Sequence, residues 1–291
     1  MPPVSLVVCV HGERELLQRL LQVAVGCHDD LVVVHDGPDV KGLRAPVEAA
    51  GGRFFERPRL SQQEPHWPFA WGQAAHDWIL RLDADEFPSE EMKIWLGNFR
   101  GGPAPVDAVS GFSCIWPLWN GRRAVTSRWP AGRIFLFHRE RVRFFGMPEQ
   151  VPVADGRYEA QDFVLHHQPE RKTYGLRNLL TRKQAYRWRT HIAHALLDEP
   201  GKLICWRWED RPWPQVWQDI RQHPVRTSLR RLTRGTLAGL RDQWRLENHL
   251  FPAAAISGPI NHALIAFAYL CSRLVSARRE LEPARQSVRD D

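Results

Sequence analysis

Residues 78–86 read Trp-Ile-Leu-Arg-Leu-Asp-Ala-Asp-Glu, a short apolar run that passes directly into acids. Such a run is typical of a buried β-strand. Alternate side chains of an extended segment share a face, so Asp83 and Asp85 are expected to point the same way. Their mutual repulsion favours a divalent cation, and carboxylate oxygens suit Mg²⁺ or Mn²⁺. The alternative is a solvated acidic turn before the helix expected from Pro88-Ser89-Glu90-Glu91 onward.

The residues before this stretch alternate between apolar runs and a helical stripe. The runs predicted as strands are Val4–Val10, Leu31–His35 and Arg53–Glu56. Leucines recur at helical spacing over Glu13–Val25, which indicates βαβ units and a parallel sheet. Ligands of such sheets bind outside the carboxyl ends of the strands. Asp36, which follows the second strand, is therefore a candidate binding residue, although an Asx turn with Gly37 would explain it equally well.

The pattern changes after residue 103, where predicted strands follow one another without regular helices. These strands are Ala108–Trp116, Arg133–His138, Val142–Phe145 and Phe163–His166. They indicate mixed or antiparallel additions to the sheet. From Thr173 onward the pattern is mainly helical, so we predict an α/β domain over residues 1–170 and a basic helical region over 171–291.

Charge is distributed unevenly along the 291 residues, whose formal net charge is +7. Between Arg171 and Arg245, 17 Lys and Arg face 6 Asp and Glu, a local excess of 17 − 6 = +11. This excess indicates an anionic partner: nucleic acid, a phosphorylated lipid surface or the phosphates of a substrate. The five cysteines include no C-x-x-C pair, which argues against a zinc knuckle or a disulfide framework.

Targeting signals are not apparent, because the chain opens directly into its first predicted strand. The most apolar stretch, Ala253–Leu274, is interrupted by Pro259 and Asn261, and we predict a buried or interfacial helix there. We therefore expect a cytoplasmic protein, and peripheral contact with the inner face of the membrane stays open.

Two further motifs follow predicted strands and carry side chains suited to catalysis or metal binding. Glu149 lies in a loop and is either a general base or a surface residue. His166 and His167 end another strand and could provide an imidazole ligand.

Together these motifs resemble family 2 glycosyltransferases of the GT-A type over about residues 4–170. The resemblance rests on the first strand, on Asp36, on residues 78–86, and on three later motifs. The three later motifs are Gly132–Phe137, Phe145-Gly146-x-x-Glu149 and Leu165-His166-His167. They resemble motifs of the bacterial branch that includes lipopolysaccharide-core glucosyltransferases.

The resemblance implies a GT-A fold, Rossmann-like and mainly parallel, that binds a nucleotide-diphosphate sugar and Mn²⁺ or Mg²⁺. It implies an enzyme of the EC 2.4 class that serves cell-envelope polysaccharide synthesis, with a glycan or lipid-linked acceptor. The donor-binding residues it implies are His11, Glu13, Asp36, Asp83 and Arg133. The implied metal ligands are Asp85 with His166 or His167, and Glu149 is the implied catalytic base of an inverting transfer.

A last match lies in the basic region. Gln184-Ala185-Tyr186-Arg187-Trp188 fits the Q-x-x-R-W motif of processive synthases, which the resemblance places near acceptor and diphosphate. Gln184, Arg187 and Trp188 are the residues concerned.

Two other functions remain open from the sequence. A nucleotidyltransferase would also combine a βαβ sheet with metal-binding acids, but the segment after Val10 has no Gly-rich, Lys- or Arg-containing phosphate loop. A noncatalytic nucleic-acid-binding protein would explain the basic region, but no zinc finger, RNP or helix-turn-helix signature accompanies it. We therefore expect no nucleic-acid partner.

Overall fold

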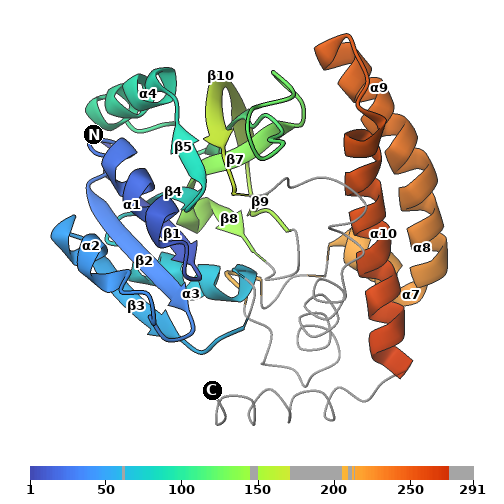
Figure 1. Ribbon diagram of the computed structural model, residues 1–291, viewed down its shortest axis with the longest axis horizontal. Helices are drawn as coiled ribbons and strands as arrows, with labels where there is room; N and C mark the ends of the chain where they lie inside the picture. The colour runs from blue at the N-terminus through green and yellow to red at the C-terminus, as the bar shows by residue number, and fades with distance from the viewer. Residues whose placement is uncertain (61–62, 145–149, 171–204, 209–211, 213, 275–291) are drawn as a thin grey trace. The chain divides into compact units, whose positions relative to one another are not determined.

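The computed structural model describes residues 1–60, 63–144, 150–170, 205–208, 212 and 214–274 (Figure 1). The chain divides into two compact units. Unit 1 comprises Met1–Phe145, Gln150–Thr173 and Cys205–Trp208, and unit 2 comprises Gly146–Glu149, Tyr174–Ile204 and Glu209–Asp291. Each unit is described separately below.

Unit 1 is built on an eight-stranded mixed sheet in the order β3-β2-β1-β4-β7-β6-β10-β5. Its strands are β1 (Val4–Val10), β2 (Asp30–Asp36), β3 (Arg53–Arg57), β4 (Trp78–Asp83), β5 (Glu86–Pro88), β6 (Val109–Ile115), β7 (Ala131–His138) and β10 (Arg157–His167). The first four strands along the chain run parallel, whereas β7 is antiparallel to β4 and β6. The predicted mainly parallel α/β sheet with antiparallel additions is confirmed. A separate two-stranded ribbon joins β8 (Val142–Arg143) to β9 (Val153–Ala154).

Helices connect the parallel strands and cover both faces of the sheet. They are α1 (Arg14–Val23), α2 (Arg44–Ala49), α3 (Trp67–Gln73) and α4 (Glu90–Gly101), with short 3₁₀ turns η1 (Glu64–His66) and η2 (Arg139–Arg141). The central strand β1 is buried along its whole length, as expected of a strand covered on both faces. Helix α4 begins where the sequence predicted, because the Ser89 hydroxyl caps it by accepting the Met92 amide.

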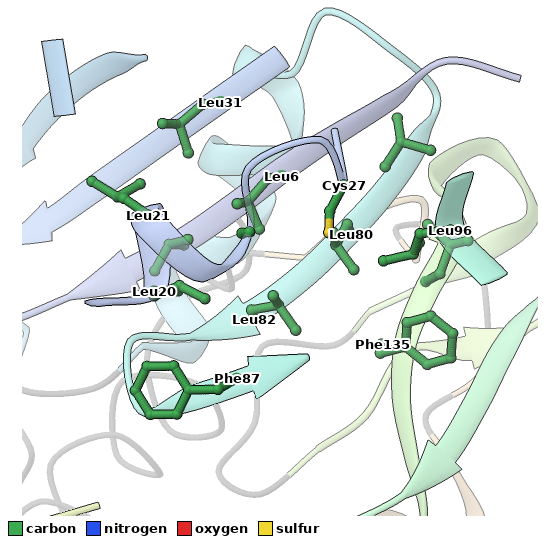
Figure 2. Close-up of a cluster of buried hydrophobic side chains, with 14 of the residues drawn as sticks. Leu6, Leu20, Leu21, Cys27, Leu31, Leu80, Leu82, Phe87, Leu96 and Phe135 are labelled. Carbon is green, nitrogen blue, oxygen red and sulfur yellow. The ribbon is translucent and has the colours of Figure 1, made fainter. Parts of the chain in front are cut away.

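The two faces of the sheet carry separate apolar clusters. On one face Leu20 and Leu21 of α1 pack over Leu6, Leu80 and Leu82 of the central strands (Figure 2). Figure 2 also shows Leu96 and Phe135 at the α4 end of this cluster. On the other face α3 supplies two buried tryptophans, Trp67 and Trp71, which pack with Ile79, Phe137 and Phe144. Because alternate residues of β4 serve opposite clusters, its register is fixed by burial on both sides.

Two strands of the eight-stranded sheet differ most from the sequence expectation, and in the two-stranded ribbon β9 was not predicted while β8 ends at Arg143. Strand β10 begins at Arg157, six positions before the predicted Phe163, because its first half pairs with β6 through a polar, half-exposed segment that lacks an apolar run. Strand β5 was not predicted, since its three residues lie within the acidic turn. The antiparallel pairing of β5 with the end of β10 turns this segment into sheet.

Unit 2 is helical where it is described, as predicted for the C-terminal region. Its elements are α7 (Gln215–Gln222), α8 (Pro224–Arg230), the π-turn η4 (Arg231–Gly235), α9 (Thr236–Glu247) and α10 (Pro252–Leu274). Helix α9 ends at Asn248, which adopts a left-handed conformation with φ 56°. Gly239 lets α9 approach α10 closely, because a Cβ there would lie 2.9 Å from the Ala255 carbonyl oxygen.

Helix α10 continues through Pro259 rather than ending at it. Its segment Pro252–Leu270 is long and apolar enough to span a membrane by length and composition alone. However, 44% of that segment is buried within the protein, a property it shares with the core helices of many soluble folds.

Candidate functional site

The candidate site lies at the carboxyl edge of the parallel strands. Cys9 is in register with Asp83 across β1 and β4, and Val10 is in register with His35 across β1 and β2. The segments that follow these strands therefore leave the sheet at the same level. This is the edge at which open α/β sheets bind their ligands.

Asp36 is buried at this edge, with 6% of its side chain exposed. One of its carboxylate oxygens accepts the Leu60 amide at 2.5 Å and lies 2.9 Å from His66 Nε2. Burial opposes the charge of this carboxylate, but the hydrogen bonds from His66 and Leu60 outweigh it and lower the pKa of Asp36. Asp36 thus anchors the segment before α3.

His11 and Glu13 form the turn that follows β1. The imidazole Nδ1 of His11 lies 2.6 Å from the Asp36 carbonyl oxygen, and the Glu13 carboxylate accepts the His11 amide. Gly12, with φ +78°, allows the sharp bend between them, and the Lys41 ammonium donates to its carbonyl at 2.8 Å. The structure therefore brings His11, Glu13 and Asp36 together at this edge.

A cluster of charged side chains closes the other end of the site. The Arg133 guanidinium donates through Nη2 to Asp83 and to Glu86, each at 2.9 Å, and its Nε lies 2.8 Å from Glu86. Glu86 is fully buried and also accepts the Trp116 indole N–H and the Asp83 amide. The Glu86 carboxylate thus connects Asp83, Trp116 and Arg133, which come from separate segments of the chain.

Burial and charge act in opposite directions within this cluster. Burial raises the pKa of Glu86, although Arg133 opposes the rise. Burial also disfavours the charge on Arg133, but Glu86 and Asp83 outweigh it and raise the pKa of the guanidinium. A buried acid and a buried base that are this close stabilise each other's charged forms.

Asp85 meets a histidine on β10. His167 Nε2 lies 3.3 Å from Asp85 Oδ2, and the imidazole stacks on Trp116 at a centroid distance of 4.1 Å. His166 lies one residue away on the strand, so its side chain points to the other face, near Glu91 and Arg19. Of the two histidines singled out from the sequence, the structure brings His167 to Asp85.

Donor groups for a divalent cation are present here, but they do not complete a site. Within the residues that the structure describes, no group of three or more His, Cys, Asp or Glu side chains is arranged to hold a metal ion. The Asp85 carboxylate and the His167 imidazole are oxygen and nitrogen donors that Mn²⁺ accepts. Asp83 Oδ1 is buried beside them and has no hydrogen-bond partner in the described structure. The donor atoms of Asp85 and His167 suit a divalent cation, but other ligands would have to complete its coordination.

Four predicted residues cannot be placed. Glu149, Gln184, Arg187 and Trp188 lie outside the described residues.

Sequence reasoning missed three residues of the site. Glu86 closes the acidic turn, and its position three residues after Asp83 could have identified it as a third acid of the same cluster. His66, the last residue of η1, contacts Asp36 from 30 positions further along the chain, and Trp116, the residue after β6, contacts His167, which is 51 positions away. No local pattern marks His66, whereas Trp116 ends the predicted strand Ala108–Trp116 and could have been found from that position.

Comparison with known proteins finds similarity among solved structures only. No protein-family model and no curated protein match the chain. Among solved structures, TarS of S. aureus aligns with a TM-score of 0.34 and 11% identity, over 69% of this chain and 41% of TarS. TarS 1-349 in complex with UDP aligns with a TM-score of 0.37 and 11% identity, over 94% and 92%. CMP:2-keto-3-deoxy-manno-octonic acid synthetase complexed with CTP aligns with a TM-score of 0.31 and 14% identity, over 47% of this chain and 71% of the synthetase.

The chain thus spans about two fifths of the longer TarS chain. Scores and identities at this level do not establish a shared function.

Proposed function

We propose that the chain is a glycosyltransferase of the GT-A type that moves a sugar from a nucleotide-diphosphate sugar to a hydroxyl group. The observation that carries this proposal is the convergence of Asp36, Asp83, Asp85 and His167 at the carboxyl edge of one mainly parallel sheet. Asp83 Oδ1 is buried and has no hydrogen-bond partner among the described residues, which supports a ligand hydroxyl or a cation at that edge.

We assign different parts of the nucleotide-sugar donor to different described residues. His11, Glu13 and Asp36 would surround the base, and Asp83, held by Arg133, would accept a ribose hydroxyl through its free oxygen. Asp85 and His167 would hold Mn²⁺ or Mg²⁺. A bound divalent ion supplies positive charge that stabilises the departing diphosphate. Arg133 stays paired to its acids and therefore positions Asp83 rather than neutralising phosphate.

The acceptor side of the proposal rests on the sequence. Glu149 would take the proton of the attacking hydroxyl on the face of the sugar opposite the diphosphate, which inverts the anomeric centre. Gln184, Arg187 and Trp188 would contact the acceptor or the diphosphate. The resemblance to enzymes of lipopolysaccharide-core synthesis favours a glycan or lipid-linked acceptor, hence a role in cell-envelope polysaccharide synthesis and a cytoplasmic location.

We also propose that unit 2 contacts an anionic membrane surface. Exposed apolar side chains, among them Leu229, Leu237 and Trp244, alternate with exposed Arg226 and Arg245 on its helices. A hollow of about 370 Å³ opens between α8 and α10 and is lined almost wholly by apolar side chains. Arginines attract anionic headgroups while apolar side chains enter the interface, which is the pattern of a peripheral membrane contact.

A thermal-shift panel tests the catalytic proposal. Uridine, guanosine and thymidine diphosphates, each with and without Mn²⁺, should raise the Tm of the wild type in a metal-dependent way, because they bind the folded state. Asp85→Ala should abolish the metal-dependent part of the shift. Asp107→Ala, which removes an almost fully exposed acid at the amino end of β6, should keep it.

The same panel separates the alternatives. Equal shifts in Asp85→Ala and in the wild type would refute the metal role of Asp85. Stabilisation by nucleoside triphosphates but by none of the diphosphates would favour a nucleotidyltransferase. Salt-sensitive retention on DNA that survives Asp85→Ala would favour a nucleic-acid-binding protein.

A further inference from the structure

Arg81 is a buried cation that the proposed mechanism leaves unused. It lies in β4, two residues before Asp83 and therefore on the same face of the sheet, with 6% of its surface exposed. Its guanidinium carbon lies 5.0 Å from the centre of the Trp67 ring. This cation–π contact involves the flat face of the guanidinium and provides no hydrogen-bond acceptor for its N–H groups.

The hydrogen-bonding capacity of Arg81 is unused within the described structure. No hydrogen bond or ion pair joins its guanidinium to a described residue, and its Nε is completely buried without an acceptor. Two other arginines of unit 1 behave differently: Arg133 binds two acids, and Arg139 donates to two backbone carbonyls and pairs with Asp77.

The charge of Arg81 is nevertheless retained. Burial lowers its pKa to about 10, with Arg133 adding to the fall, so the guanidinium stays protonated at neutral pH. Asp83, Glu86 and Glu64 favour that charge electrostatically but accept no hydrogen bond from it. A buried, charged donor group without acceptors is costly, and such groups are rare unless a ligand or ordered water completes them.

The position of Arg81 indicates which ligand would complete it. Trp67, on which it stacks, directly follows His66, the histidine that binds Asp36. Asp83, two residues further along β4, precedes Asp85, which lies 3.3 Å from His167. Arg81 therefore lies between the end of the site assigned to the base and the end assigned to the metal. A nucleoside diphosphate that spans these ends carries its phosphates past this guanidinium.

We infer that Arg81 is an anion-binding residue of this site and donates hydrogen bonds to diphosphate oxygens of the nucleotide. A planar guanidinium matches two phosphate oxygens at once, and its charge offsets theirs without a metal. The inference rests on the proposed function for the identity of the ligand. It explains why β4 carries an arginine at this buried position, where an apolar residue like its neighbours would avoid the cost of burying a charge.

Binding of uridine diphosphate and of inorganic pyrophosphate, measured by calorimetry in EDTA, tests this inference. Arg81→Met should weaken both ligands about 10- to 100-fold, the loss expected for hydrogen bonds from a charged donor. Its Tm without ligand should stay equal to that of the wild type or rise, because a buried charge without acceptors is replaced by an apolar chain of similar length. Arg81→Lys, which keeps the charge, should bind with an intermediate affinity.

Arg139→Met is the matched control, since Arg139 is a paired arginine at the amino end of β4. It should lower the Tm and leave both affinities unchanged. If Arg81→Met binds both ligands with wild-type affinity, the inference is overturned. The same holds if Arg81→Met retains binding and its ligand-free Tm falls as far as that of Arg139→Met, because Arg81 would then be a structural residue. A wild type that binds pyrophosphate through Arg81 but no nucleoside diphosphate would overturn the proposed function and leave the anion site standing.

Discussion

Replacing Arg133 by Met removes the cation that holds two acids together inside unit 1. Glu86 is fully buried and Arg133 is 15% exposed, so the pair is shielded from water on both sides. The variant loses three contacts of 2.8–2.9 Å and leaves the charges of Glu86 and Asp83 uncompensated. Removing one partner of a buried ion pair costs about 3–5 kcal/mol. For a unit of this size that corresponds to a fall in Tm of roughly 6–20 °C.

Urea unfolding followed by far-UV circular dichroism measures this loss, with an unchanged m-value as the check that the unfolding transition is the same. Glu86→Gln in the Arg133→Met background should recover about 1–3 kcal/mol, because it removes the stranded charge and keeps an acceptor for Trp116. Arg157→Met is the control: its pair with Glu159 is largely exposed and should be worth about 0–1 kcal/mol.

The reasoning is refuted if Arg133→Met costs less than about 1 kcal/mol, or if it costs no more than Arg157→Met. A double variant that is less stable than Arg133→Met would also refute it, since the stranded charge would then not be the cause of the loss.

Two further predictions concern pH and membranes. Hydrogen bonds lower the pKa of Asp36 in the folded state, so its stabilising contribution is present above the ordinary pKa of aspartate and is lost as the pH falls through the folded-state value. Between about pH 4 and pH 2 the Tm of the wild type should therefore fall more steeply than that of Asp36→Asn, and parallel curves would contradict this. Vesicles with anionic lipid should co-sediment the protein in a salt-sensitive way, and neutral vesicles should not. Trp244→Ala should weaken this binding, and equal binding to both vesicle types would exclude the proposed contact.

The central part of the fold could be predicted from the sequence because burial on both faces leaves a strong signal. The strand Val4–Val10 is found with its predicted bounds, and β2 extends one residue beyond its prediction at each end. β3 and β4, the latter predicted over Trp78–Leu82, each extend one residue further at the carboxyl end. The polar half of β10 gave no such signal, since its stability comes from pairing with β6 and not from an apolar run.

The candidate site was predictable only where its residues follow strands. Asp36, Asp83 and Asp85 were recognised because the carboxyl ends of parallel strands meet at one edge. The partner of Asp36 could not be, because His66 reaches it from a 3₁₀ turn about 30 residues away, where tertiary contacts alone decide which side chains meet. Trp116 directly follows β6, which runs in the direction of β4, so the same argument from strand ends applies to it.

The return of the chain at Cys205–Trp208 has a practical consequence for producing unit 1 alone. Trp206 pairs with Phe144 through two backbone hydrogen bonds, its indole donates to the Arg139 carbonyl, and its ring packs against Trp71. An N-terminal fragment that stops at residue 170 would lack this segment and would uncover the aromatic surface beneath it. A minimal catalytic fragment would therefore have to carry residues 205–208 back to the sheet, by retaining the intervening chain or by splicing a short linker in its place.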